Sequence, residues 1–243
     1  MRISKLLTCQ ITHYQIFLTM PIQPLYLLAD SQLLFWKEDG GRLFLERVRE
    51  QIESNTPAAA YIGASNADTP EYFLLFQSAM EQIQVSNCRM IPSRMQQEDR
   101  AFVESADLLL LAGGDVELGW RVFEENGLKE IIVRRRIEGT TFIGISAGAV
   151  QMGVGSLTES ANMRKIDMFR FAPFYVGAHE EQQEWWNLRA LVNLAGEGAR
   201  GIGIPAGGGA IYSSDGTLEP VRKPLVEFLK QEQDLAEHLL LPS

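Results

Sequence analysis

Two short apolar segments, each followed at once by small residues, constrain the fold of this chain more than any other feature. The segment 108–112 (LLLLA) leads directly into Gly113 and Gly114, and 140–145 (TTFIGI) leads directly into Ser146. Each is too short for a buried helix, and apolar runs of this length are typical of strands covered on both faces. We therefore expect two neighbouring buried strands that end in tight turns.

The first two thirds of the chain alternates between such strands and amphipathic stretches with helical spacing. This alternation predicts an α/β fold, with a mainly parallel sheet flanked by helices on both faces in three layers. In sheets of this kind ligands bind beyond the carboxyl ends of the strands, where Gly113, Gly114 and Ser146 fall. The expected strands are 24–29, 58–65, 88–91, 108–112 and 140–145, and the expected helices are 43–52, 70–84, 98–105 and 117–138, the last broken near Gly127.

The last third of the sequence is less regular. A helix is expected at 184–194, and strands at 201–205 and 210–214. Asp215 and Gly216 predict a hairpin turn, with 218–221 as the return strand. Apolar residues at helical spacing over 225–241 predict an amphipathic C-terminal helix. We treat 20–243 as a single domain, and 1–19 as an extension that is disordered or lies upstream of the true start.

Composition excludes several classes of function. The net charge is −9 and the sequence pI about 5.0, so the chain lacks the basic face that a nucleic acid or an anionic membrane would require. Two cysteines allow neither a zinc motif nor a disulfide framework, which fits a reducing, cytoplasmic setting. No apolar run is long enough for a transmembrane helix. An acidic α/β domain with an apolar C-terminal helix could form a homodimer.

The segment 144–148 (GISAG) matches the pattern G-x-S-x-G. It follows a predicted buried strand and precedes a helix-like segment, which is the context that a nucleophilic serine on a sharp turn requires. The flanking glycines let neighbouring backbone pass close to the turn. We therefore predict that Ser146 is a nucleophile. A glycine-rich turn in which Ser146 only caps the helix is the alternative.

Such a serine needs an oxyanion hole and a general base. The N–H groups of Gly114 and of Ala147, the residue after the serine, are the predicted oxyanion donors. His179, in a loop-like stretch before a predicted helix, is the best candidate for the base. His238 falls in the predicted C-terminal helix, and His13 lies in the N-terminal extension.

These segments together resemble the S51 serine peptidases, which include aspartyl dipeptidase (peptidase E) and cyanophycinase. The resemblance rests on LLLLAGGD, on TTFIGISAGAV and on a histidine about 30 residues later, and spans roughly 24–213. It implies a fold similar to class I glutamine amidotransferases and no metal or organic cofactor. It also implies hydrolysis of short peptides or amides, which in the family takes place next to aspartate, in aspartyl dipeptides or in β-linked aspartyl-arginine. Ser146 and His179 match the catalytic pair, and Gly114 and Ala147 match the oxyanion hole. The segment 160–163 (SANM) resembles a family stretch only loosely.

One departure from the family pattern bears on activity. The family's third catalytic residue is a glutamate in a segment close to G-I-P-E-G, and here the matching segment is 203–207 (GIPAG), with Ala206 in the acid's place. Three consequences are open. A Ser–His dyad works slowly; another carboxylate (Asp167, Glu180 or Asp215) reaches His179; or the domain is a binding protein without hydrolase activity. A separate alternative is a conventional α/β-hydrolase with Ser146, Asp215 and His238.

Overall fold

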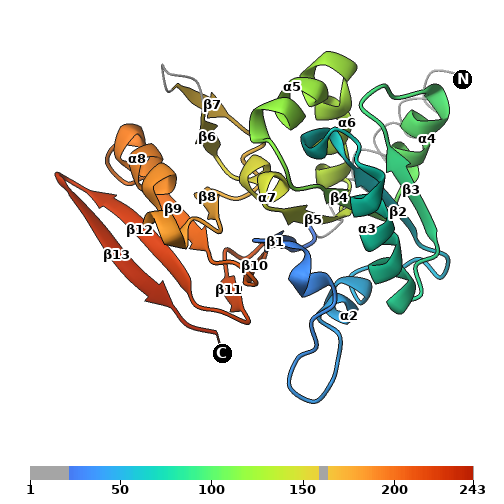
Figure 1. Ribbon diagram of the computed structural model, residues 1–243, viewed down its shortest axis with the longest axis horizontal. Coiled ribbons are helices and arrows are strands. Elements are labelled where there is room, and N and C mark those ends of the chain that lie inside the picture. The colour runs from blue at the N-terminus through green and yellow to red at the C-terminus, as the bar shows by residue number, and fades with distance from the viewer. Residues whose placement is uncertain (1–21, 159–163, 243) are drawn as a thin grey trace, which may run out of the picture.

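A seven-stranded sheet forms the centre of the fold (Figure 1). The computed structural model describes residues 22–158 and 164–242, so the extension at 1–19 and the segment 160–163 lie outside the described residues. The strand order is β11-β10-β1-β5-β4-β2-β3; the last five of these are parallel, and the β10–β11 hairpin joins them antiparallel. The strands are β1 (Leu25–Leu28), β2 (Ala58–Ile62), β3 (Asn87–Ile91), β4 (Leu108–Leu111), β5 (Thr141–Ile145), β10 (Gly209–Tyr212) and β11 (Leu218–Val221).

Helices cover both faces of this sheet, as the alternating pattern predicts. Successive residues of a strand point to opposite faces, so Leu109 and Leu111 of β4 enter one core and Leu108 and Leu110 the other. The first core is closed by α4, α5, α6 and α7, and the second by η1, α2 and α3. The helices are η1 (Ser31–Leu34), α2 (Phe44–Arg49), η2 (Ala64–Asn66), α3 (Pro70–Gln82), α4 (Gln97–Ser105), α5 (Val116–Asn126), α6 (Leu128–Ile137) and α7 (Ala147–Met152).

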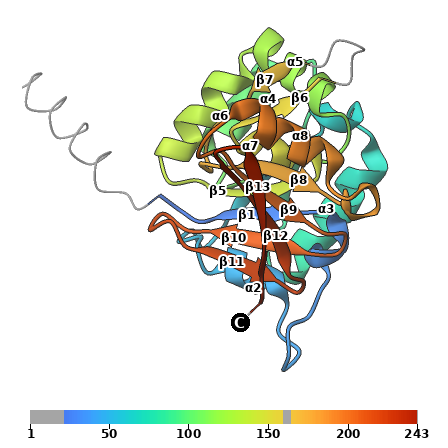
Figure 2. The ribbon, with the colours of Figure 1, turned by 90° about the vertical axis from the view of Figure 1, so that its left-hand side faces the viewer.

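A second, four-stranded sheet lies beside the first and has the order β13-β12-β9-β8 (Figures 1 and 2). Helix α8 packs against it, and Trp185, Leu188 and Phe228 contribute to the small core between them. The predicted strand at 201–205 belongs to this sheet. A two-stranded sheet of β6 and β7 completes the structure. The remaining elements are β6 (Gly155–Leu157), β7 (Lys165–Asp167), β8 (Tyr175–Ala178), η3 (Glu181–Gln183), α8 (Trp186–Ala195), β9 (Arg200–Ile204), β12 (Leu225–Gln231) and β13 (Asp234–Leu240).

The predicted C-terminal helix over 225–241 is wrong. This segment forms the antiparallel hairpin β12–β13, and β12 also pairs with β9. The edge of β9 supplies hydrogen-bond partners along β12, and the buried Phe228 fills the core under α8. These long-range contacts outweigh a weak helical preference. The turn has Glu232 at a φ of 49°, without the glycine or asparagine that would signal a hairpin.

Because residues 225–240 form a hairpin, the predictions that depended on a C-terminal helix change. His238 lies on β13, opposite Glu227, and is exposed. Strand β13 is an edge of its sheet, and Leu239 on it is 64% exposed. The homodimer stays a prediction, now without the helix on which it rested. Within the described residues, no helix is both long and apolar enough to cross a membrane.

Candidate functional site

The carboxyl ends of the parallel strands meet at one edge of the central sheet. Ile145 at the end of β5 is opposite Leu28 of β1, and Gly144 is opposite Leu111 of β4. The residues that follow β4 and β5 are therefore neighbours. A Cβ built on Gly113 would lie only 3.3 Å from the Cβ of Ser146.

Ser146 occupies the sharp turn between β5 and α7. Its φ of 48° and ψ of −110° lie outside the conformations that serine readily adopts, and a backbone of this kind costs about 1–3 kcal/mol. The turn is held on both sides: the Ser146 N–H donates to Leu28 O at 2.8 Å, and the Val150 N–H donates to Ser146 O at 3.0 Å. The structure thus has the strained strand-to-helix turn that the G-x-S-x-G pattern predicts.

The two glycines of this pattern are needed for close packing of α7 on the sheet. A Cβ on Gly144 would lie 2.7 Å from the backbone N of Ala149, and a Cβ on Gly148 would lie 2.1 Å from Leu111 O. Backbone atoms cannot turn aside as a flexible side chain can. Glycine at both positions therefore lets α7 start directly on top of β4 and β5.

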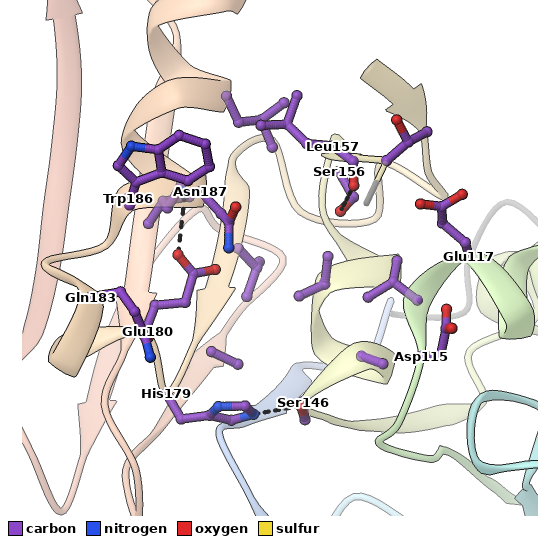
Figure 3. Close-up of a pocket in the computed structure, with 18 of the residues that line it drawn as sticks. Asp115, Glu117, Ser146, Ser156, Leu157, His179, Glu180, Gln183, Trp186 and Asn187 are labelled. Carbon is purple, nitrogen blue, oxygen red and sulfur yellow. Dashed lines mark hydrogen bonds between the residues drawn. The ribbon is translucent and has the colours of Figure 1, made fainter. Parts of the chain in front are cut away.

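His179 lies within hydrogen-bond distance of this serine. It follows β8, its N–H donates to Ile204 O at 2.9 Å, and its φ is 47°. Its Nε2 lies 2.8 Å from the Ser146 Oγ (Figure 3). The second sheet thus brings the residue predicted as the base to the residue predicted as the nucleophile, 33 positions apart in sequence.

The predicted oxyanion donors flank Ser146. Ala147 is the first residue of α7, so its N–H has no acceptor within the helix. Gly114, with a φ of 131°, passes so close to η2 that a Cβ would lie 2.1 Å from Ser65 O. No hydrogen bond from the Gly114 N–H is found within the described part of the chain. Both residues line the same cavity as Ser146 and His179.

Two carboxylates that the sequence analysis missed bind the backbone at the alanine that replaces the family acid. Glu181 Oε1 accepts a hydrogen bond from the Ala206 N–H at 3.0 Å, and Asp30 Oδ2 accepts one from the Gly207 N–H at 2.6 Å. Asp30 lies just after the carboxyl end of β1, and this position could have identified it from the sequence as a candidate site residue. No nearby sequence pattern identified Glu181 as a site residue, because its partner Ala206 is 25 residues away.

The three carboxylates proposed from sequence as partners of His179 bind elsewhere. Asp167 pairs with Arg170 at 2.9 Å, and Asp215 accepts from the Thr217 N–H in the exposed β10–β11 turn. Glu180 accepts from the Leu188 N–H at 3.2 Å, in the first turn of α8. Within residues 22–158 and 164–242, no hydrogen bond to the Nδ1 of His179 is found.

The alternative of a conventional α/β-hydrolase is not supported by this geometry. The Ser146 Oγ bonds to His179, whereas His238 lies on β13 at the far edge of the second sheet. Asp215 forms its hydrogen bond within its own turn. The structure therefore does not bring Ser146, Asp215 and His238 together.

Two cavities meet at Ser146. The larger, of about 550 Å³, lies between α5, α7 and α8 and includes Asp115, Glu117, Glu180 and Trp186 (Figure 3). The smaller, of about 230 Å³, lies towards η1 and α3 and is lined mainly by apolar and aromatic side chains. Gly114, Ser146 and His179 line both. A substrate bound across Ser146 would therefore extend into two cavities of different character.

The surroundings of Glu180, in the larger cavity, shift the pKa of its carboxyl group. Burial raises its pKa above the ordinary value, while hydrogen bonds from the backbone N–H groups of Leu188 and Asn187 and the charge of His179 oppose this rise. Such competing influences are common at functional sites. The residues described contain no cluster of three or more side chains suited to hold a metal ion.

With this geometry established, sequence comparison supplies the family. Residues 27–219 match peptidase family S51. The chain belongs to peptidase family S51. The match covers most of the central sheet together with Ser146, His179 and Ala206, and it agrees with the resemblance found in the motifs.

Two solved structures of proteins described as peptidases have a similar fold. A peptidase from an acI-B1 Actinobacterium is 14% identical, with a TM-score of 0.59 over 92% of this chain and 96% of its own. A protein from Listeria monocytogenes EGD-e described as a peptidase E is 12% identical, with a TM-score of 0.53 over 90% of this chain and 98% of its own. At these identities the likeness shows the fold alone. A comparison with curated proteins gives no significant match.

Proposed function

We propose that this S51-family chain is a serine peptidase of short peptides or amides. Ser146 is the nucleophile, His179 the general base, and the N–H groups of Gly114 and Ala147 form the oxyanion hole. The observation that carries the proposal is the 2.8 Å contact between the Ser146 Oγ and the His179 Nε2 at a strained strand-to-helix turn.

The chemistry follows the general scheme of serine hydrolases. The Ser146 Oγ attacks the scissile carbonyl carbon while His179 Nε2 takes the hydroxyl proton. The oxyanion that forms is stabilised by the two N–H donors, and the start of α7 adds the partial positive charge of a helix N-terminus. His179 then gives the proton to the leaving amine. Water, activated by the same histidine, hydrolyses the acyl-enzyme and restores Ser146.

A fluorophosphonate probe tests this proposal directly. We expect the probe to label the wild-type protein at Ser146, because an activated serine hydroxyl attacks phosphorus as it attacks a carbonyl. Ser146→Ala should abolish labelling, whereas Ser156→Ala, at another serine of the same cavity, should retain it. Mass spectrometry of the labelled peptide is the measurement. A wild-type protein that stays unlabelled between pH 6 and 9 would contradict the proposal.

A binding protein on the same scaffold is the second candidate, favoured by Ala206. A methyl group cannot hold an imidazole in one tautomer or stabilise an imidazolium, and loss of the acid in a protease triad lowers turnover by about 10⁴-fold. The missing acid therefore predicts either a slow enzyme or none. Unlabelled Ser146 together with measurable peptide binding would support this second candidate.

Restoring the acid distinguishes two cases. In one, a Ser–His dyad works slowly without an acid; in the other, another group already orients His179. We expect Ala206→Glu to raise the labelling rate by about tenfold or more, because its carboxylate would occupy the position of the family acid. Ala206→Gln, of equal size but uncharged, is the matched control. Equal rates for wild type and Ala206→Glu would indicate that another group, such as Glu181 beside it, already orients His179.

A further inference from the structure

The larger cavity beside Ser146 is acidic. Asp115, Glu117 and Glu180 line it, and the lining residues within 22–158 and 164–242 include no lysine or arginine. The smaller cavity adds Asp30, and the described residues that line it likewise include no lysine or arginine. The basic side chains Arg121 and Arg164 line a neighbouring cavity, which shares Glu117 with the larger one but does not include Ser146. A substrate carboxylate in the larger cavity would therefore meet like charge.

Two of these carboxylates are held in place from opposite sides of the cavity. Glu180 accepts from the Leu188 N–H of α8, and Asp115 accepts from the Leu118 N–H of α5 at 2.9 Å. Figure 3 shows Glu180 on one side of the cavity and Asp115 with Glu117 on the other. The N-termini of α5, α7 and α8 lie at this cavity and contribute about half a positive charge each. The carboxylates of Asp115 and Glu180 by themselves exceed this total, which leaves the cavity negative.

An aromatic ring adds to the preference of this cavity for cations. Trp186 lines it next to Glu180 and is 56% exposed (Figure 3). An indole face attracts an ammonium or guanidinium group through the negative face of its ring. The partly buried Glu180 also gains from a cation nearby, since an opposite charge offsets the cost of burying its carboxylate.

The smaller cavity has the opposite preference. Tyr61, Leu75, Phe76 and Ile145 are among the residues that line it, so an apolar or aromatic side chain would bury there. Because Ser146 lies between the cavities, one substrate would place a group in each, on the two sides of the bond that is cleaved.

We propose that this site cleaves a short peptide with a positively charged group in the larger cavity and an apolar side chain in the smaller one. The proposal rests on the proposed function and adds the substrate class. Repulsion by the carboxylates of the larger cavity disfavours acidic peptides, while attraction to them favours basic ones. The charge can be a basic side chain or the amino terminus of the peptide.

A dipeptide series tests the preference in both orientations. We expect the better of Lys-Leu and Leu-Lys to exceed the better of Asp-Leu and Leu-Asp by about tenfold or more in kcat/KM. Ala-Leu and acetyl-Lys-Leu distinguish the two sources of charge, since the first keeps only the amino terminus and the second only the side chain. Equal or faster cleavage of the aspartyl peptides would overturn the proposal.

Two matched variants test whether the larger cavity causes the preference for basic substrates. Glu180→Gln removes one charge and keeps an oxygen that can accept from the Leu188 N–H, so the ratio of basic to acidic substrates should fall. Glu125→Gln removes the same charge from an exposed position of α5 outside both cavities, and should leave the ratio unchanged. The same ratio in all three proteins would contradict the role given to the cavity.

Calorimetry measures dipeptide binding to Ser146→Ala. It therefore tests the charge preference independently of the proposed hydrolase activity. Tighter binding of Lys-Leu than of Asp-Leu supports the charge preference even if wild type is not labelled by fluorophosphonate. Labelled wild type with tighter binding of Asp-Leu would sustain the hydrolase and overturn the preference. Failure of both Lys-Leu and Leu-Lys to bind at millimolar concentration would also overturn it.

Discussion

Replacing His179 by alanine is expected to lower the rate of acylation at Ser146 by about 10²-fold or more, since the absent triad acid already removes part of the histidine's effect. His179 Nε2 is the group found at hydrogen-bond distance from the Ser146 Oγ among the described residues, and without it the hydroxyl keeps its proton. Fluorophosphonate inactivation kinetics measure this rate without knowledge of the natural substrate.

Two controls make the His179 result specific. His179 is exposed, so His179→Ala should keep the wild-type melting temperature and circular dichroism spectrum. His238→Ala changes an equally exposed histidine on β13 and should acylate at the wild-type rate. Acylation of His179→Ala within tenfold of wild type would exclude His179 as the base. A large loss in His238→Ala would revive the conventional hydrolase arrangement.

Adding a single methyl group at Gly148 is expected to destabilise the protein by about 3 kcal/mol or more. Overpacking of a core typically costs about 1–3 kcal/mol, and here the new Cβ would lie 2.1 Å from Leu111 O and 2.6 Å from Leu111 C, both backbone atoms of a central strand. A loss of this size lowers the melting temperature of a domain of this length by about 6–12 °C. Thermal and urea unfolding of Gly148→Ala measure it.

Gly127→Ala separates this clash from the backbone preference of glycine. Gly127 has a φ of 74°, and the atom nearest to a Cβ built there is the end of an arginine side chain at 3.5 Å. Gly127→Ala should therefore lower the free energy of unfolding only by the cost of a left-handed backbone, about 1–2 kcal/mol. Gly148→Ala should be clearly less stable than this control, and should also acylate more slowly because Ser146 lies directly before α7. A Gly148→Ala protein as stable as wild type would contradict the close approach of α7 to β4.

Much of the central fold follows from local signals in the sequence. The strands at β1, β2, β4 and β5 were predicted within a few residues, because each is a short apolar run bounded by polar or small residues. The break between α5 and α6 was predicted at Gly127, which takes the left-handed conformation that glycine favours. The prediction was wrong at 225–241, where pairing with β9 decides the structure.

In the candidate site too, local sequence determined some features and tertiary contacts determined the others. The sequence by itself determined the strained turn at Ser146 and the glycines around it, because turn chemistry depends on residues adjacent in the chain. It also singled out His179, with help from the family pattern, and the alanine at 206. Only the tertiary structure decided that Glu181 and Asp30 meet the backbone at Ala206 and Gly207. It also decided that carboxylates at the start of α5 and in the segment after β8 face one cavity. Those contacts join residues far apart in sequence, and no local pattern specifies them.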